Sequence, residues 1–120
     1  METILVQDTD KDILELLTVA LDIEGFTVYS MTDCDQGFLE FIEMHRPHVV
    51  ILDYRLDGKA CKDALQQIRS KYPHLPVIAT SCNSNIHEVY DKHGFNDYIK
   101  KPFDLELLYS VLRKHIKKAG

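Results

Sequence analysis

Asp8, Asp53, Ser81 and Lys101 each stand at the end of a short segment rich in apolar or β-forming residues. The clearest case is Asp53, because it ends the most continuous apolar run of the chain, VVIL at residues 49–52. A carboxylate can act as a nucleophile, a lysine can bind phosphoryl oxygens, and a hydroxyl can donate a hydrogen bond to them. Together these side chains predict a phosphoryl-transfer site, provided that the fold brings them to one place.

Apolar segments and helical repeats alternate along the chain. The segments predict five strands, at residues 4–6, 26–29, 49–52, 76–79 and 97–100. Apolar residues at helical spacing predict five helices, at residues 13–21, 38–42, 64–68, 86–92 and 104–115. Because near-continuous apolar strands are buried on both faces, we expect a parallel sheet with helices on each side. The predicted fold is one α/β domain over residues 1–120, a doubly wound sheet whose ligands bind at the carboxyl ends of the strands.

Composition and charge exclude several classes of protein. The chain has 120 residues, of which 45% are hydrophobic and 28% charged, and these values are typical of a globular domain rather than a disordered one. Its net charge of −5 argues against direct binding of nucleic acid, whose phosphates attract clustered cations. Three widely spaced cysteines predict free thiols, and the six histidines show no zinc-binding spacing. The chain shows neither a signal peptide nor an apolar run of membrane-spanning length, so we expect a cytoplasmic protein that makes no membrane contact.

Four stretches of the sequence, taken together, resemble one protein family. They are ILVQD at residues 4–8, VVILDYRL at 49–56, PVIATS at 76–81 and DYIKKPF at 97–103. In this order they are similar to the receiver domain of two-component response regulators, and the resemblance covers the whole chain. It implies a flavodoxin-like sheet with strand order 2-1-3-4-5. It also implies a signalling phosphoacceptor rather than an enzyme, with a sensor histidine kinase or phosphotransfer protein upstream and an output domain or protein downstream.

The resemblance assigns chemical roles to the residues at the strand ends. It implies that Asp53 takes the phosphoryl group of a phosphohistidine and becomes an aspartyl phosphate. A Mg²⁺ ion is implied between Asp8, Asp53 and the backbone carbonyl of Arg55, where it neutralises charge on the transferring group. Lys101 is implied to pair with a phosphoryl oxygen.

A second set of implied roles concerns switching and the lifetime of the acyl phosphate. The Ser81 hydroxyl is implied to turn toward the phosphoryl group, and Tyr98 to follow it inward. This movement changes the face made by the fourth helix, the fifth strand and the fifth helix, a two-state element biased by a local charge. Arg55 and Asn83 lie two residues beyond Asp53 and Ser81, where side chains of this family screen the acyl phosphate from water. The alternative for Tyr98 is a half-buried strand aromatic with no switching role.

The sequence departs from the family pattern directly after the first strand. Receiver domains normally carry two adjacent acids there, and the second acid is here replaced by Thr9. A neutral hydroxyl is a poorer ligand for a hard cation, so we expect weakened Mg²⁺ binding, with Thr9 itself or Asp10 as substitute ligands. The alternative is that Asp10 is an ordinary polar loop residue. Gln7 also stands where an apolar residue is usual, and a buried amide there needs hydrogen-bond partners.

Two other functions are compatible with the sequence. A weakened metal site is what a degenerate pseudo-receiver would have, and such a protein-interaction module takes up no phosphoryl group from acetyl phosphate or a kinase. Asp8 and Asp10 also resemble the DxD motif of haloacid-dehalogenase-type phosphatases, in which the first acid is the nucleophile and the second a general acid. Asp53 has no role in that enzyme, so phosphatase turnover that survives Asp53→Asn would identify it.

Overall fold

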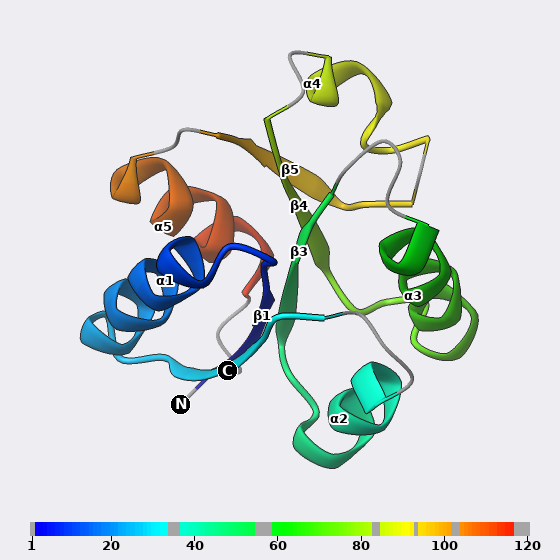
Figure 1. Cartoon of the computed structure of the whole chain (residues 1–120), viewed down its shortest axis with the longest axis horizontal. Helices are drawn as coiled ribbons and strands as arrows, with labels where there is room; N and C mark the ends of the chain where they lie inside the picture. The colour runs from blue at the N-terminus through cyan, green and yellow to red at the C-terminus, as the bar shows by residue number, and fades with distance from the viewer. Residues whose placement is uncertain are drawn as a thin grey trace.

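Figure 1 shows the computed structural model, which describes residues 2–33, 37–54, 59–82, 85–92, 94–101 and 104–116. Over these residues strands and helices alternate, as the sequence predicts. The strands are β1 (Thr3–Gln7), β2 (Thr27–Met31), β3 (Val49–Asp53), β4 (Val77–Ser81) and β5 (Asp97–Lys100). The helices are α1 (Lys11–Ile23), α2 (Gly37–His45), α3 (Lys59–Lys71), α4 (Ile86–Val89) and α5 (Leu105–His115). None of these helices, over the residues described, is both long enough and apolar enough to cross a membrane.

The sheet has five strands, all parallel, in the order β2-β1-β3-β4-β5. This order confirms the doubly wound, flavodoxin-like topology. Strand β1 lies beside β3, with Gln7 opposite Leu52, and β3 lies beside β4, with Asp53 opposite Thr80. The carboxyl ends of the three central strands therefore meet at one edge of the sheet.

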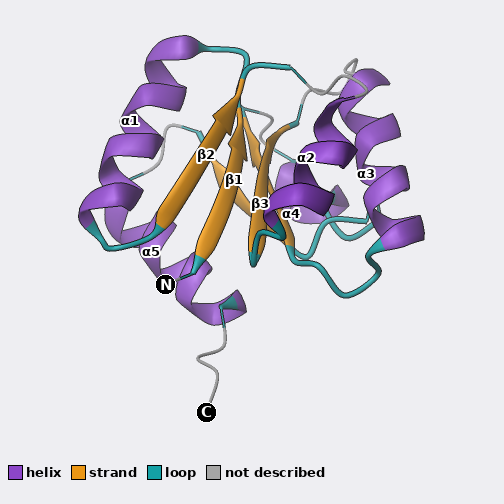
Figure 2. Cartoon of the chain, turned by 90° about the horizontal axis from the view of Figure 1, so that it is seen from below, coloured by secondary structure: helices purple, strands orange, loops and turns teal. Residues whose placement is uncertain are grey.

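Two apolar cores hold the helices to the sheet. Successive side chains of a strand point to opposite faces. In β1, Leu5 packs in the core beneath α2, α3 and α4, whereas Ile4 and Val6 pack in the core beneath α1 and α5. Strands β3 and β4 are buried along their whole length, which is why they appear in the sequence as apolar runs. Figure 2 shows the twisted sheet between these two layers of helices.

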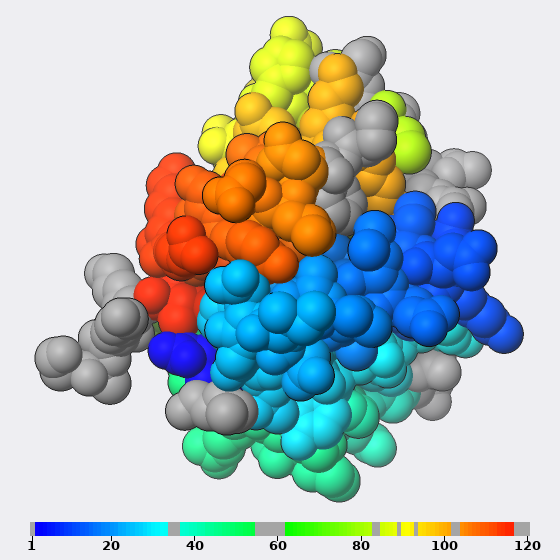
Figure 3. All heavy atoms as spheres, turned by 90° about the vertical axis from the view of Figure 1, so that its left-hand side faces the viewer, coloured from blue at the N-terminus to red at the C-terminus, as the bar shows by residue number. Residues whose placement is uncertain are grey.

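Helices α1 and α5 lie side by side and form one face of the molecule (Figure 3). Leu14 and Leu17 of α1 share an apolar core with Leu108 of α5. The Tyr109 hydroxyl also donates to the backbone carbonyl of Ala20 at 3.2 Å. This packing holds α1 against α5 and the sheet.

Helix α4 is shorter than the predicted helix at residues 86–92, because it ends at Val89. The chain then turns, with the Gly94 N–H donating to the Asp91 carbonyl and the Phe95 N–H donating to the Tyr90 carbonyl. Gly94 has a φ of +99°, a left-handed conformation that often ends helices and that favours glycine. Phe95 is buried in the core beneath α2, α3 and α4. The glycine therefore marks the end of the turn that follows α4 rather than the end of the helix, and the predicted helix was three residues too long.

Candidate functional site

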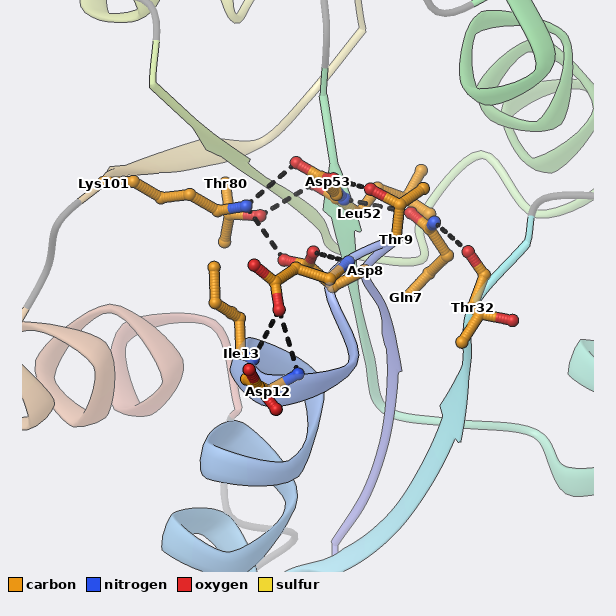
Figure 4. A network of polar contacts seen from close by, with 11 residues as sticks. Gln7, Asp8, Thr9, Asp12, Ile13, Thr32, Leu52, Asp53, Thr80 and Lys101 are labelled. Carbon is orange, nitrogen blue, oxygen red and sulfur yellow. Dashed lines mark hydrogen bonds and ion pairs between the residues drawn. The ribbon is translucent and has the colours of Figure 1, made fainter.

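Asp8, Asp53 and Lys101 meet at the carboxyl edge of the sheet (Figure 4). Asp53 is the last residue of β3, Asp8 directly follows β1, and Lys101 directly follows β5. The Lys101 Nζ lies 2.9 Å from Asp8 Oδ2 and 3.0 Å from Asp53 Oδ1. The side chains of Asp8, Asp53 and Lys101 are only 0%, 4% and 10% exposed. The structure therefore brings together three of the side chains that the sequence singled out.

The backbone of β4 places the lysine. The Lys101 N–H donates to the Ser81 carbonyl at 2.7 Å, which continues the pairing between β4 and β5 for one residue beyond the strand. Because β4 lies between β3 and β5, the Lys101 side chain must reach past the end of β4 to contact Asp53. Ser81 itself is buried at this end of β4.

Two carboxylates and one ammonium leave this cluster with a net charge of −1 when all are ionised. Burial on its own would lower the pKa of the Lys101 ammonium. The hydrogen bonds and negative charges of Asp8 and Asp53 outweigh that effect, so the pKa of Lys101 is raised above its ordinary value. Lys101 is therefore a permanent cation at neutral pH, suited to binding an anionic oxygen.

Thr9 contacts the same cluster through its hydroxyl. Thr9 Oγ1 donates a hydrogen bond to Asp53 Oδ2 at 3.1 Å. The sequence identified Thr9 as the replacement for an acid and as a candidate metal ligand, and this donor role was not predicted. An ordinary threonine in a loop has the same appearance in a sequence whether its hydroxyl faces solvent or a neighbouring carboxylate, so no local signal could have found it.

The buried amide of Gln7 has the partners that its burial requires. Its Nε2 donates to the Thr32 carbonyl at 2.9 Å, and its Oε1 accepts from the backbone N–H of Asp53 at 3.1 Å. Gln7 therefore links the segment after β2 to the end of β3. This link helps to fix the position of the Asp53 backbone and so of its carboxylate.

Asp10 caps the first helix. Its Oδ1 accepts from the backbone N–H of Asp12 at 2.9 Å and of Ile13 at 3.3 Å. Its own N–H donates to Asp8 Oδ1 at 2.9 Å. An aspartate directly before a helix is a common N-cap, and this sequence signal could have assigned the role. We therefore favour a capping role for the Asp10 carboxylate over metal binding.

The remaining predicted site residues differ in how far the structure describes them. Tyr98 is half-buried on β5, and its ring centroid lies 5.0 Å from that of Tyr90, just after α4. Cys82, which is not one of the predicted site residues but one of the three cysteines predicted to be free thiols, directly follows β4 and is exposed. Arg55 and Asn83 lie outside the described residues, so the predicted carbonyl ligand and the two residues predicted to affect lifetime are not located.

The carboxylates at this edge fit a magnesium ion by their chemistry. Mg²⁺ prefers oxygen ligands and is commonly held by one or two carboxylates, with water and phosphate oxygens completing its shell. Asp8 and Asp53 supply two such carboxylates side by side around Lys101. Among the described residues no group of three or more His, Cys, Asp or Glu side chains could hold a metal. The protein therefore offers a partial shell that other oxygen ligands would have to complete.

The fold and this cluster define a receiver-type α/β domain, with a parallel sheet that ends in two acids and a lysine. The model of the response regulator receiver domain family matches residues 4–113 of the chain. The chain belongs to this family. Receiver domains are signalling domains, and members of the family typically bind Mg²⁺.

Relatives and solved structures agree with this assignment. The probable transcriptional regulatory protein TcrX of Mycobacterium tuberculosis is 29% identical over 120 residues, which is 98% of this chain and 51% of TcrX. The nitrogen assimilation regulatory protein NtrX of Azorhizobium caulinodans is 30% identical over 118 residues, or 95% of this chain and 26% of NtrX. The chain thus spans about half of the first relative and a quarter of the second. The crystal structure of the receiver domain of NtrX from Brucella abortus has a TM-score of 0.83 at 31% identity, covering 97% of this chain and 99% of that one.

Proposed function

We propose that the chain accepts a phosphoryl group on Asp53 from a phosphohistidine of a sensor histidine kinase or phosphotransfer protein. An Asp53 carboxylate oxygen forms a bond to phosphorus while the phosphorus–nitrogen bond breaks, and the imidazole, already protonated on its other nitrogen, leaves as a neutral ring. The main support for this proposal is the bridge that Lys101 makes between the buried carboxylates of Asp8 and Asp53 at the carboxyl edge of the sheet. That is the edge at which doubly wound sheets bind their ligands.

The charge of the cluster suits this reaction. Lys101 pairs with a phosphoryl oxygen, because it is buried, charged and already within 3.0 Å of the acceptor. We propose that Asp8, Asp53 and the backbone carbonyl of Arg55 hold Mg²⁺, which when bound supplies positive charge against the phosphoryl oxygens. Asp8 contributes a second buried carboxylate to that shell.

We propose further that phosphorylation is transmitted through Ser81 and Tyr98. Ser81 is buried at the end of β4, next to the strand that carries Asp53. Tyr98 contacts Tyr90, so movement of its ring would alter the surface of α4, β5 and α5. For Arg55 and Asn83 the proposal rests on sequence position alone, and Arg55→Ala is expected to change the half-life of the phosphorylated protein several-fold.

The proposed partners are the kinase or phosphotransfer protein upstream and an output domain or protein downstream. The net charge of −5 supports a protein partner rather than nucleic acid bound by this chain. We propose that the reaction takes place in the cytoplasm. The chain itself is proposed to be a phosphoacceptor and not an enzyme.

A pseudo-receiver is the second candidate, and the observation that favours it is Thr9. A neutral residue in this position leaves the cluster with two acids rather than three. The phosphatase alternative loses support, because the carboxylate that would act as its general acid caps α1 instead.

Mass spectrometry after incubation with acetyl phosphate and Mg²⁺ separates these candidates. We expect a gain of one phosphoryl group, localised to Asp53 and absent from Asp53→Asn and Asp53→Ala. Asp10→Asn is the matched control, because it removes a nearby acid while asparagine keeps the cap. A wild-type chain that takes up no phosphoryl group from acetyl phosphate or from a histidine kinase would identify a pseudo-receiver. A phosphoryl group retained in Asp53→Ala would move the acceptor elsewhere.

A further inference from the structure

The Asp53 carboxylate is held at both of its oxygens. Lys101 Nζ lies 3.0 Å from Oδ1, and the Thr9 hydroxyl donates to Oδ2 at 3.1 Å. Lys101 follows β5, Thr9 lies between β1 and α1, and the two side chains approach Asp53 from opposite sides (Figure 4). An aspartate has staggered wells at its first side-chain torsion and a broad second torsion. Two donors on different oxygens restrict both torsions.

The two donors do not restrict Asp53 equally. The ammonium of Lys101 sits at the end of a flexible four-carbon side chain, so it could follow the Asp53 carboxylate into another rotamer. Thr9 has a short, β-branched side chain with few rotamers, so its hydroxyl could not follow. Of these two donors, Thr9 is therefore the one that favours one orientation of Asp53 over the others.

The residues on either side of Thr9 hold its backbone in place. Asp8 is fully buried and bound to Lys101, and it accepts the Asp10 N–H at its other oxygen. Asp10 caps α1 through Oδ1. Because both neighbours are anchored, the loop presents the Thr9 hydroxyl to Asp53 at a fixed position.

A carboxylate at position 9 would act differently. Two like charges at this separation repel each other, so an acid there would approach Asp53 only when a cation lies between them. The hydroxyl of Thr9 is neutral, so its hydrogen bond to Asp53 needs no cation to offset a charge repulsion. A neutral donor at position 9 can therefore orient the Asp53 carboxylate whether or not a cation is bound.

We propose that Thr9 is a positioning residue for Asp53, whose hydroxyl holds the acceptor carboxylate in one orientation before a cation or a phosphodonor binds. The consequence for phosphoryl transfer rests on the proposed function of Asp53. The orientation itself does not, so the two can be tested separately.

The first test measures orientation in the metal-free protein. Three-bond couplings of the Asp53 side chain report whether its first torsion occupies one well or several. We expect one well in the wild type and in Thr9→Ser, which keeps the hydroxyl, and averaging in Thr9→Val, which replaces the hydroxyl with a methyl group of similar size. A single well in Thr9→Val, or averaging in the wild type, would overturn the proposal.

The second test measures the rate of Asp53 labelling by acetyl phosphate at saturating phosphodonor and Mg²⁺. We expect Thr9→Val to be about tenfold slower, the effect of one hydrogen bond to a charged group, and Thr9→Ser to stay within about threefold of the wild type. Equal rates for Thr9→Val and the wild type, or equal loss in Thr9→Ser and Thr9→Val, would contradict the positioning role. A wild-type chain with one Asp53 rotamer but no labelling would overturn the proposed function and leave the positioning role standing.

Discussion

The ammonium of Lys101 lies 3.0 Å from Oδ1 of Asp53, although 48 residues separate them in the sequence. The contact is possible because β3 and β5 end at the same edge of the sheet, on either side of β4. Both side chains are buried, so water and salt screen this pair far less than an ion pair on the surface. The stability of the protein and the proposed reactivity of Asp53 therefore depend on the same lysine.

Removing the Lys101 charge should destabilise the fold through the acids that it bridges. We expect Lys101→Met to lower the free energy of unfolding by about 3–5 kcal/mol at neutral pH, because Asp8 and Asp53 remain buried without their cation. Adding Asp8→Asn to Lys101→Met should recover part of this loss, whereas Asp8→Asn alone should destabilise the wild type. Urea unfolding of the four proteins measures this. An equal cost of Asp8→Asn in both backgrounds would show that the contacts are not coupled.

The raised pKa of Lys101 predicts how the difference in stability between the wild type and Lys101→Met changes with pH. A lysine whose pKa is higher in the folded than in the unfolded protein stabilises the fold fully below its ordinary pKa of 10.5. This stabilisation is lost as the pH rises through the folded pKa, which lies above that value. The stability gap between the wild type and Lys101→Met should therefore stay constant from about pH 7 to pH 9.5 and shrink above about pH 10.5. A gap that closes already between pH 7 and pH 9 would contradict the raised pKa.

The capping role of Asp10 predicts that Asp10→Ala and Asp10→Asn differ in stability. Alanine cannot accept the N–H groups of Asp12 and Ile13, so Asp10→Ala should lose about 1 kcal/mol of stability. Asparagine is an equally good cap, so Asp10→Asn should unfold close to the wild-type denaturant midpoint. Thermal and urea unfolding test this directly. If Asp10→Asn loses as much stability as Asp10→Ala, the negative charge rather than the cap is what matters.

The bridge made by Gln7 should protect the backbone amide of Asp53. In Gln7→Leu the Asp53 N–H loses the acceptor that lies 3.1 Å away, and we expect a loss of about 1–2 kcal/mol in stability. Hydrogen exchange of the Asp53 amide should accelerate by more than this global loss explains. The Ile51 amide of the same strand serves as the internal control. Equal acceleration at both amides would mean that Gln7 stabilises the whole fold and gives the Asp53 amide no local protection.

The fold was predictable because its signals are local. The alternation of Ile4, Leu5 and Val6 between two cores and the unbroken apolar run at residues 49–52 specify buried parallel strands. Asp53 and Lys101 were predictable as neighbours, since the carboxyl ends of parallel strands share one edge. The contact from Thr9 to Asp53 was not, because it depends on where a side chain points after the loop has folded. The helix predicted at residues 86–92 was too long, because Gly94 ends the turn that follows α4 and not the helix itself.

Thr9 also leads us to expect weaker Mg²⁺ binding than a second acid at this position would give. At an effective dielectric constant of about 20, two unit charges 4 Å apart attract by roughly 4 kcal/mol, and a divalent ion doubles this before desolvation. Desolvation of an added carboxylate, and its repulsion from Asp8 and Asp53, offset most of that gain. We therefore estimate that the missing acid costs about 1–3 kcal/mol in Mg²⁺ binding, or roughly 5- to 150-fold in affinity.

Thr9→Asp should accordingly bind Mg²⁺ more tightly and speed phosphorylation of Asp53. The same variant should unfold at a lower temperature than the wild type without Mg²⁺, because it adds a negative charge where the Thr9 hydroxyl now donates to Asp53. Added Mg²⁺ should raise its unfolding temperature by more than it raises that of the wild type. Thr9→Asn is the matched neutral control, and calorimetric titration of these proteins and of Asp10→Asn is the measurement. If Thr9→Asp binds no more tightly than Thr9→Asn, or if Asp10→Asn abolishes binding, Asp10 supplies the metal ligand and Thr9 does not set the affinity.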